Sequence, residues 1–238
     1  GRMPLLAEFG CGGSRPRGRE AQERGMDIAE IKGFDDPRLP DWLDIWQAAF
    51  PAEELVPFSR VLCELGRSGS PHHFVAGSID DRVCAMAWYV DMAGGTDHGA
   101  IWLWYLAVHW EMRGRGHGAA LLRDLVDRFR RRGTVRALVL EVEDPDALKG
   151  PRSDLAWRRI GFYQRLGCGL LTGVSYSIRA AAWSPRTRMC WMVLPFAPLV
   201  AEEAFELIRV STEAEISRVG PLGLEFGEPS VPNQPTRP

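Results

Sequence analysis

Residues 106–122 read LAVHWEMRGRGHGAALL: a β-prone run ends in a turn with three glycines, and an amphipathic helix follows. At a helix N-terminus, unpaired backbone N–H groups and the helix dipole attract an anion, and glycine lets the backbone approach a phosphate closely. Seven arginines against two aspartates between residues 112 and 132 add positive charge. We therefore predict an anion site in the turn itself, made by Arg113, Gly114, Arg115, Gly116, His117, Gly118 and Ala119.

The turn alone leaves the kind of anion open. No Lys-Ser or Lys-Thr closes it, which excludes the phosphate loop of nucleotide hydrolases. The spacing Gly114-x-Gly116-x-x-Ala119 fits a dinucleotide turn, with Glu141 or Glu143 at the end of the next expected strand. Against this, the turn follows expected antiparallel strands and only one clear βαβ unit surrounds it. A nicotinamide- or flavin-dependent oxidoreductase therefore stays an alternative.

Composition narrows the class of protein. The chain has 238 residues, of which 45% are hydrophobic and 25% charged, as expected of one globular domain. Its net charge of −2 gives no reason to expect nucleic acid or an anionic membrane as partner, and no apolar run is long enough to span a bilayer. The five cysteines are widely spaced without a C-x-x-C pair, so we expect no metal site and a reducing, cytoplasmic location.

Three regions follow from the hydrophobic pattern. Residues 1–25 are rich in glycine and arginine without a hydrophobic period, which predicts a disordered arm. Residues 216–238 are rich in proline and glycine and are predicted to form a tail. Residues 26–215 form the expected folded domain.

Within that domain, the apolar spacing predicts a mixed sheet with one central βαβ unit. The expected strands are Asp27–Lys32, His73–Ser78, Val83–Asp91, Ala100–His109, Arg136–Glu143, Cys168–Ile178 and Arg188–Leu194. The expected helices lie near residues 42–50, 53–65, 118–129, 153–166 and 201–208, the fourth capped by Ser153 and followed by Gly167.

Two motifs in register resemble a known family. The turn is similar to the acyl-CoA-binding motif Gln/Arg-x-x-Gly-x-Gly/Ala of the GNAT acyltransferases, with Arg113, Gly116 and Gly118 at its fixed positions. The run RIGFYQRLG at residues 159–167 resembles the family's second motif, an aromatic residue and a tyrosine on a helix that ends in glycine. The resemblance covers roughly residues 27–195.

The resemblance implies an α/β fold whose mostly antiparallel sheet has a splayed central parallel pair, with helices on both faces. It implies acetyl-CoA as cosubstrate, with its pantetheine arm bonded to the backbone of Leu106, Ala107 and Val108 and an N–H near Leu106 polarising the thioester carbonyl. Tyr163 falls where the family places the acid that protonates the departing thiolate. The family often has asparagine seven residues earlier, where this chain has Ala156, whose methyl group cannot make that side-chain contact to the coenzyme.

An amine must lose a proton before it attacks, because a free alkylamine is mostly protonated at neutral pH. The period of two in residues 139–143 puts Glu141 and Glu143 on one face of a strand. If that face meets the cleft, either glutamate could accept the proton or bind a cationic substrate. If it meets solvent, they form the polar side of a half-buried strand.

The sequence thus predicts an N-acetyltransferase in which an amine, most plausibly of a small molecule, attacks the bound thioester directly. The alternatives are the oxidoreductase named above and a non-catalytic acyl-CoA-binding module. The oligomeric state stays open, with a homodimer among the options.

Overall fold

The computed structural model describes residues 25–52, 54–92, 99–172, 174, 176–179, 185–219 and 225–226. The predicted arm lies outside these residues except for Gly25, and so does most of the predicted tail. The described helices are α1 Leu39–Ala49, α2 Phe58–Gly66, α3 His117–Arg132, α4 Pro151–Gln164 and α5 Ala201–Val219. The strands are β1 Asp27–Ile31, β2 His72–Ile79, β3 Arg82–Asp91, β4 Gly99–Val108, β5 Val135–Glu143, β6 Gly169–Leu170, β7 Tyr176–Ile178, β8 Thr187–Pro195 and β9 Glu225–Phe226.

All the described strands belong to one nine-stranded sheet with the order β1-β2-β3-β4-β5-β8-β7-β9, and β6 pairs with β8. Among the pairings of these strands, β4 with β5 is parallel and the others are antiparallel. The predicted mixed sheet with a central parallel pair is therefore confirmed.

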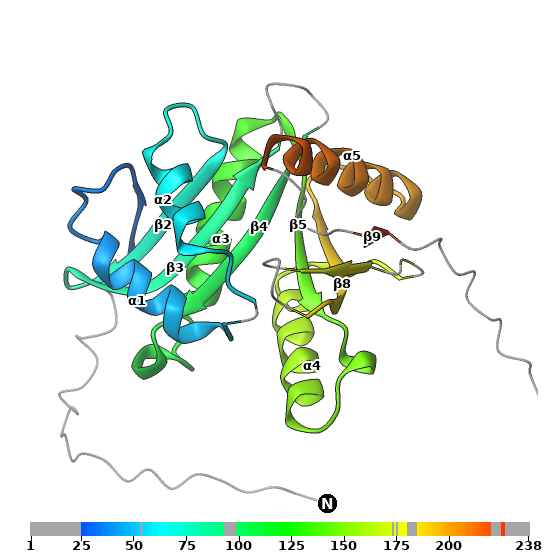
Figure 1. The fold of residues 1–238 in the computed structure, drawn as a ribbon, viewed down its shortest axis with the longest axis horizontal. Helices are drawn as coiled ribbons and strands as arrows, with labels where there is room; N and C mark the ends of the chain where they lie inside the picture. The colour runs from blue at the N-terminus through cyan, green and yellow to red at the C-terminus, as the bar shows by residue number, and fades with distance from the viewer. Residues whose placement is uncertain are drawn as a thin grey trace, which may run out of the picture.

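Helices cover both faces of the sheet. In Figure 1, α1 and α2 lie in front of β2, β3 and β4, and α3 lies behind them. Leu121, Leu125 and Phe129 of α3 pack into the largest core cluster, which also contains Ile160 of α4. A second core cluster packs α1 and α2 against the opposite face of the sheet. A third cluster packs α5 against the same face, over β4, β5 and β8. The sheet thus separates two helical layers, as the resemblance implied.

The parallel pair opens toward one end. Backbone pairing of β4 with β5 runs from Gly99 opposite Val135 to Leu103 opposite Leu140 and then stops, although both strands continue. At the same level the register of β3 against β4 shifts, and Trp104 falls between two paired residues without a partner in β3. Such a bulge bends and twists its strand. The bulge thus accounts for the separation of β4 from β5. Beyond this point the facing edges of the two strands are free to bond a ligand.

Several predicted boundaries were wrong. Helix α2 begins at Phe58 and not at Glu53, so a loop precedes it. Ser153 does not cap α4: its Oγ donates to the carbonyl of Pro145, and Gly150 occupies the N-cap with a φ of 59°. The strand expected from Cys168 to Ile178 is two short strands, β6 and β7. Helix α5 continues past residue 215 to Val219, and β9, within the predicted tail, pairs with β7.

Two negative findings concern the described residues alone. No helix among them is both long and apolar enough to cross a bilayer. They also contain no group of three or more His, Cys, Asp or Glu side chains that could hold a metal ion.

Candidate active site

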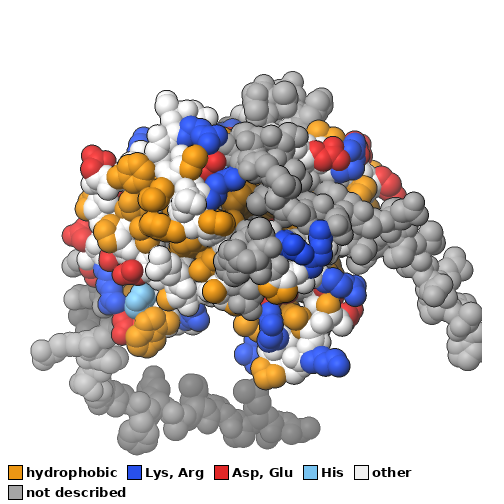
Figure 2. Space-filling model, viewed as in Figure 1, with side chains coloured by type: hydrophobic (Ala, Val, Ile, Leu, Met, Phe, Trp, Pro, Cys, Tyr) orange, Lys and Arg blue, Asp and Glu red, His pale blue; other side chains and the backbone are white. Residues whose placement is uncertain are grey.

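A cavity of about 720 Å³ opens where β4 and β5 separate. Its walls come from the α1–α2 loop, the second half of β4, the glycine turn before α3, the end of β5 and part of α4. On the face seen in Figure 2, Lys and Arg side chains gather over α4 and hydrophobic side chains gather over α1 and α2. The cavity therefore connects a basic flank with an apolar one.

The glycine turn forms one end of the cavity. Helix α3 begins after Gly116, which has a φ of 84° and leaves the helix without a side-chain cap, so its first N–H groups are free to bind a ligand. A Cβ atom on Gly118 would lie 3.2 Å from Cγ2 of Val108, so the glycine permits close packing of helix on strand. Arg113 anchors the turn, because its Nε donates to the carbonyl of Val108 over 3.1 Å.

Most of the predicted coenzyme-binding residues meet at this cavity. It is lined by Leu106, Ala107, Val108, Arg113, Gly114, Gly116, His117, Gly118 and Ala119. Arg115 differs from them: it is exposed, does not line the cavity, and places Nη1 3.6 Å from the sulfur of Met112. The positive charge of Arg115 therefore lies on the surface outside the cavity.

Tyr163 lines the cavity from α4. Burial raises the pKa of its phenol well above the ordinary value of 10, and nearby Arg159 only partly opposes this. The phenol therefore keeps its proton at neutral pH, as a proton donor must. Ala156 is wholly buried and does not line the cavity, so the asparagine contact common in the family has no counterpart at this position.

Glu141 and Glu143 both face the cavity from the end of β5, so the alternative that their face meets solvent is wrong. Burial raises the pKa of Glu141 to about 7, partly opposed by the polar groups of Tyr176 and Trp102 beside it. Glu143 is held differently. It makes a close ion pair with Nη1 of Arg159, and its Oε1 lies 3.5 Å from Nη2 of Arg152. The pKa of Glu141 suits a base at neutral pH.

Glu54 completes the carboxyl groups of the cavity, and the sequence analysis missed it. Tyr105 of β4 holds its loop in place: the hydroxyl donates to the carbonyl of Glu54 over 2.8 Å and accepts from the N–H of Val56 over 3.1 Å. Burial and the charge of Glu143 together raise the pKa of Glu54 to about 7, and Arg159 partly opposes them. No local signal could have found Glu54, because the expected helix from residue 53 would have placed it in a different geometry.

An aromatic wall faces these carboxyl groups. It consists of Phe50 from the end of α1 and of three residues of β4, namely Trp102, Trp104 and Tyr105. Phe50 meets the ring of Tyr105 edge-on, with 4.9 Å between ring centroids. Aromatic faces next to carboxyl groups suit a ligand with a positive charge on an apolar body.

Together these features define an acyltransferase: a parallel pair that splays over a glycine turn, with an ionisable group of raised pKa on each side of the gap. A model described as the acetyltransferase (GNAT) family matches residues 39–167, more than half of the chain. The chain belongs to this family. The oxidoreductase alternative is thereby excluded, and the described sheet contains one parallel pair and not the repeated units of a dinucleotide fold.

Solved structures share the fold. A putative GNAT acetyltransferase from Bacteroides thetaiotaomicron is 24% identical, with a TM-score of 0.65, over 82% of this chain and 98% of that one. The ribosomal-protein-S18-alanine N-acetyltransferase of Escherichia coli is 22% identical, with a TM-score of 0.51, over 74% and 96%. A putative acetyltransferase from Salmonella typhimurium, solved with acetyl-CoA, is 17% identical, with a TM-score of 0.53, over 74% and 96%. A search of curated protein sequences found no match.

Proposed function

We propose that the protein transfers the acetyl group of acetyl-CoA to an amine of a small molecule, by direct attack of the amine on the thioester. One observation carries the proposal: a single cavity joins the glycine turn at α3 to Tyr163 on one side and Glu141 on the other. A donor bound along the splay would place its thioester between these two groups.

The donor half of the cavity fits a coenzyme A thioester. The free N–H groups at the start of α3 and the guanidinium of Arg113 suit a pyrophosphate. From Trp104 onward, the edge of β4 that faces β5 has no strand partner in the described pairings, so its backbone can bond the amides of a pantetheine arm. Acetyl-CoA supplies the activated acyl group there, and Leu106, Ala107 and Val108 are the residues that would hold it.

Glu141 and Tyr163 can make the two proton transfers that the reaction needs. At neutral pH about half of the Glu141 carboxyls are ionised, so Glu141 can take a proton from the incoming ammonium. The amine nitrogen then forms the new C–N bond while the C–S bond breaks. Tyr163 gives its proton to the departing thiolate, whose conjugate thiol has a pKa not far from that of a phenol. The second proton that the nitrogen loses as the amide forms restores the phenol of Tyr163, and Glu141 releases the first proton to solvent.

The acceptor half favours a cationic amine. Glu54 and Glu141 supply carboxyl groups, and Phe50 and Trp104 supply aromatic surface. A cavity of about 720 Å³ has the size of a small-molecule site. We place the enzyme in the cytoplasm, and the free thiols of the four described cysteines agree with a reducing compartment.

Isothermal titration of the purified protein with acetyl-CoA, NADH and NADPH tests the donor. We expect binding of acetyl-CoA alone. Turnover is then measured as thiol release from acetyl-CoA with a panel of amines that includes benzylamine, tyramine and 1,4-diaminobutane. Binding of NADH in place of acetyl-CoA would overturn the proposal. Binding of acetyl-CoA without thiol release for any amine would support the non-catalytic module instead.

A further inference from the structure

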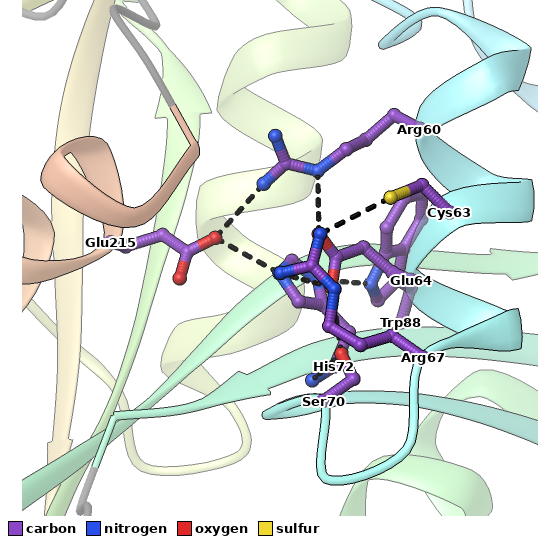
Figure 3. Close-up of polar contacts among 8 residues, drawn as sticks. All are labelled: Arg60, Cys63, Glu64, Arg67, Ser70, His72, Trp88 and Glu215. Carbon is purple, nitrogen blue, oxygen red and sulfur yellow. Dashed lines mark hydrogen bonds and ion pairs between the residues drawn. The ribbon is translucent and has the colours of Figure 1, made fainter.

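A buried polar cluster lies behind the aromatic wall, on the side away from the cavity. We call it the clamp and define it as Arg60 and Glu64 of α2, His72 of β2 and Glu215 of α5 (Figure 3). The side chains of His72, Glu64 and Glu215 are 0%, 1% and 3% exposed. The clamp thus joins three elements that are far apart in the sequence, and the proposed mechanism uses none of its residues.

Directional bonds fix the geometry of the clamp. Oε1 of Glu215 lies 2.9 Å from Nε2 of His72 and 3.0 Å from Nη2 of Arg60. Arg60 also reaches Glu64, with 3.2 Å between Nε and Oε1, and Ser70 donates to Oε2 of Glu64 over 2.7 Å. Figure 3 shows Glu215 approaching from α5 on one side while the other members come from the α2 side.

The tautomer of His72 follows from its neighbour. The indole Nε1 of Trp88 lies 2.9 Å from Nδ1 of His72, and an indole nitrogen can only donate. Nδ1 must therefore be the acceptor, so in the neutral ring Nε2 carries the proton and donates to Glu215. The two bonds hold the imidazole ring in one orientation.

This ring and the guanidinium of Arg60 support Trp104. The His72 ring meets the Trp104 indole edge-on, with 4.9 Å between centroids, and the Arg60 guanidinium lies 5.7 Å from the centroid of the same indole. Trp104 is the bulge residue of β4, and the strand register gives it no paired residue in β3 or β5. The sheet ladder therefore constrains Trp104 less than its neighbours. Its indole is held by contacts with Trp88 and Trp102, at 5.3 and 5.5 Å between ring centroids, and by the polar side chains of the clamp.

Burying carboxylates is costly, and apolar residues would hold α5 against the sheet as firmly. Ala204 and Ile208 already supply such apolar packing. The directional bonds of Glu215 with His72 and Arg60 also fix α5 in one defined position. From this geometry, and resting on the function proposed above, we propose that Glu215 is a positioning residue that, through the clamp, fixes Trp104 as the wall of the acceptor half of the cavity.

The first test needs no acceptor. The protein is labelled with 5-fluorotryptophan, and the Trp104 resonance is assigned from the Trp104→Phe variant. We expect Glu215→Ala to shift or broaden the resonance of Trp104 while leaving that of the exposed Trp110 unchanged. The matched control is Glu213→Gln, which alters an exposed glutamate of the same helix, paired with Arg209 at 2.8 Å, and should change neither. An unchanged Trp104 resonance in Glu215→Ala would overturn the inference.

The second test separates positioning from general stability. For the best amine of the panel, Glu215→Ala should raise KM about tenfold, while the acetyl-CoA Kd stays within about twofold, because the glycine turn does not contact the clamp. Glu215→Gln keeps an oxygen that can accept from His72 and should restore most of the loss. Equal weakening of both substrates would overturn the inference. If the wild-type protein acetylates no amine, the proposed function fails, and the resonance of Trp104 alone decides the inference.

Discussion

Replacing Glu141 with glutamine should stabilise the protein and at the same time remove most of its activity. Burial raises the pKa of this carboxyl from 4.5 to about 7, so the folded state holds the proton more tightly than the unfolded state does. The ionised form therefore opposes folding. The cost is absent below the unfolded pKa, grows as the pH rises between the two values, and is complete above about pH 7, where it amounts to about 3 kcal/mol.

Glutamine stays neutral at every pH and has nearly the same shape as the protonated carboxyl. We expect the free energy of unfolding of Glu141→Gln to exceed that of the wild type by about 3 kcal/mol near pH 8 and to equal it near pH 4.5. Urea unfolding followed by circular dichroism measures both values. An identical difference at the two pH values would refute the assigned pKa.

Activity should change in the opposite direction. With Glu141 as base, kcat/KM of Glu141→Gln should fall about a hundredfold near pH 8. The ratio of wild type to variant should rise about tenfold per pH unit below 7 and level off above it, because ionisation of the amine itself cancels in the ratio. Glu143→Gln is the comparison. Because Glu143 is ion-paired with Arg152 and Arg159, we do not expect it to act as the base, so the kcat/KM of Glu143→Gln should still change with pH near 7 as that of the wild type does. A ratio independent of pH would refute the base role of Glu141.

Three further predictions concern the two halves of the cavity. Gly116→Val strains a backbone with positive φ beside the coenzyme and should weaken acetyl-CoA binding at least about tenfold by calorimetry, whereas Gly133→Val, equally strained at the far end of α3, should not. Tyr163→Phe should lower kcat about a hundredfold with the acetyl-CoA Kd unchanged; an unaltered kcat would reject the acid role. Glu54→Gln should raise KM for 1,4-diaminobutane more than for benzylamine in the thiol-release assay, and equal effects would exclude Glu54 from binding a second ammonium.

The parts that the sequence could predict are those in which local chemistry decides structure. The glycines of the turn permit the backbone conformation that starts α3, and the period of two in β5 places Glu141 and Glu143 together whatever the rest of the chain does. Tyr163 could be found because its motif is local. Arg115 lies outside the cavity lining, because the charge pattern alone does not show where one long side chain is directed.

The parts that could not be predicted depend on contacts between distant residues. Glu54 enters the cavity because Tyr105, 51 positions later, bonds its loop. Ser153 looked like a cap, but the carbonyl of Pro145 takes its hydroxyl. Glu215 bonds His72 across 143 positions, and nothing in the local sequence of α5 indicates such a partner. A single sequence records propensities well, whereas these contacts appear only once the sheet has formed.

One residue of the aromatic wall, Trp102, also influences the pKa of the proposed base. Burial raises the pKa of Glu141 toward neutrality, and the polar groups of Tyr176 and Trp102 beside its carboxyl keep the shift from going further. A smaller residue at Trp102 would admit water, lower that pKa and leave Glu141 ionised but weakly basic. The proposed base and Trp102 of the acceptor wall therefore cannot be altered independently.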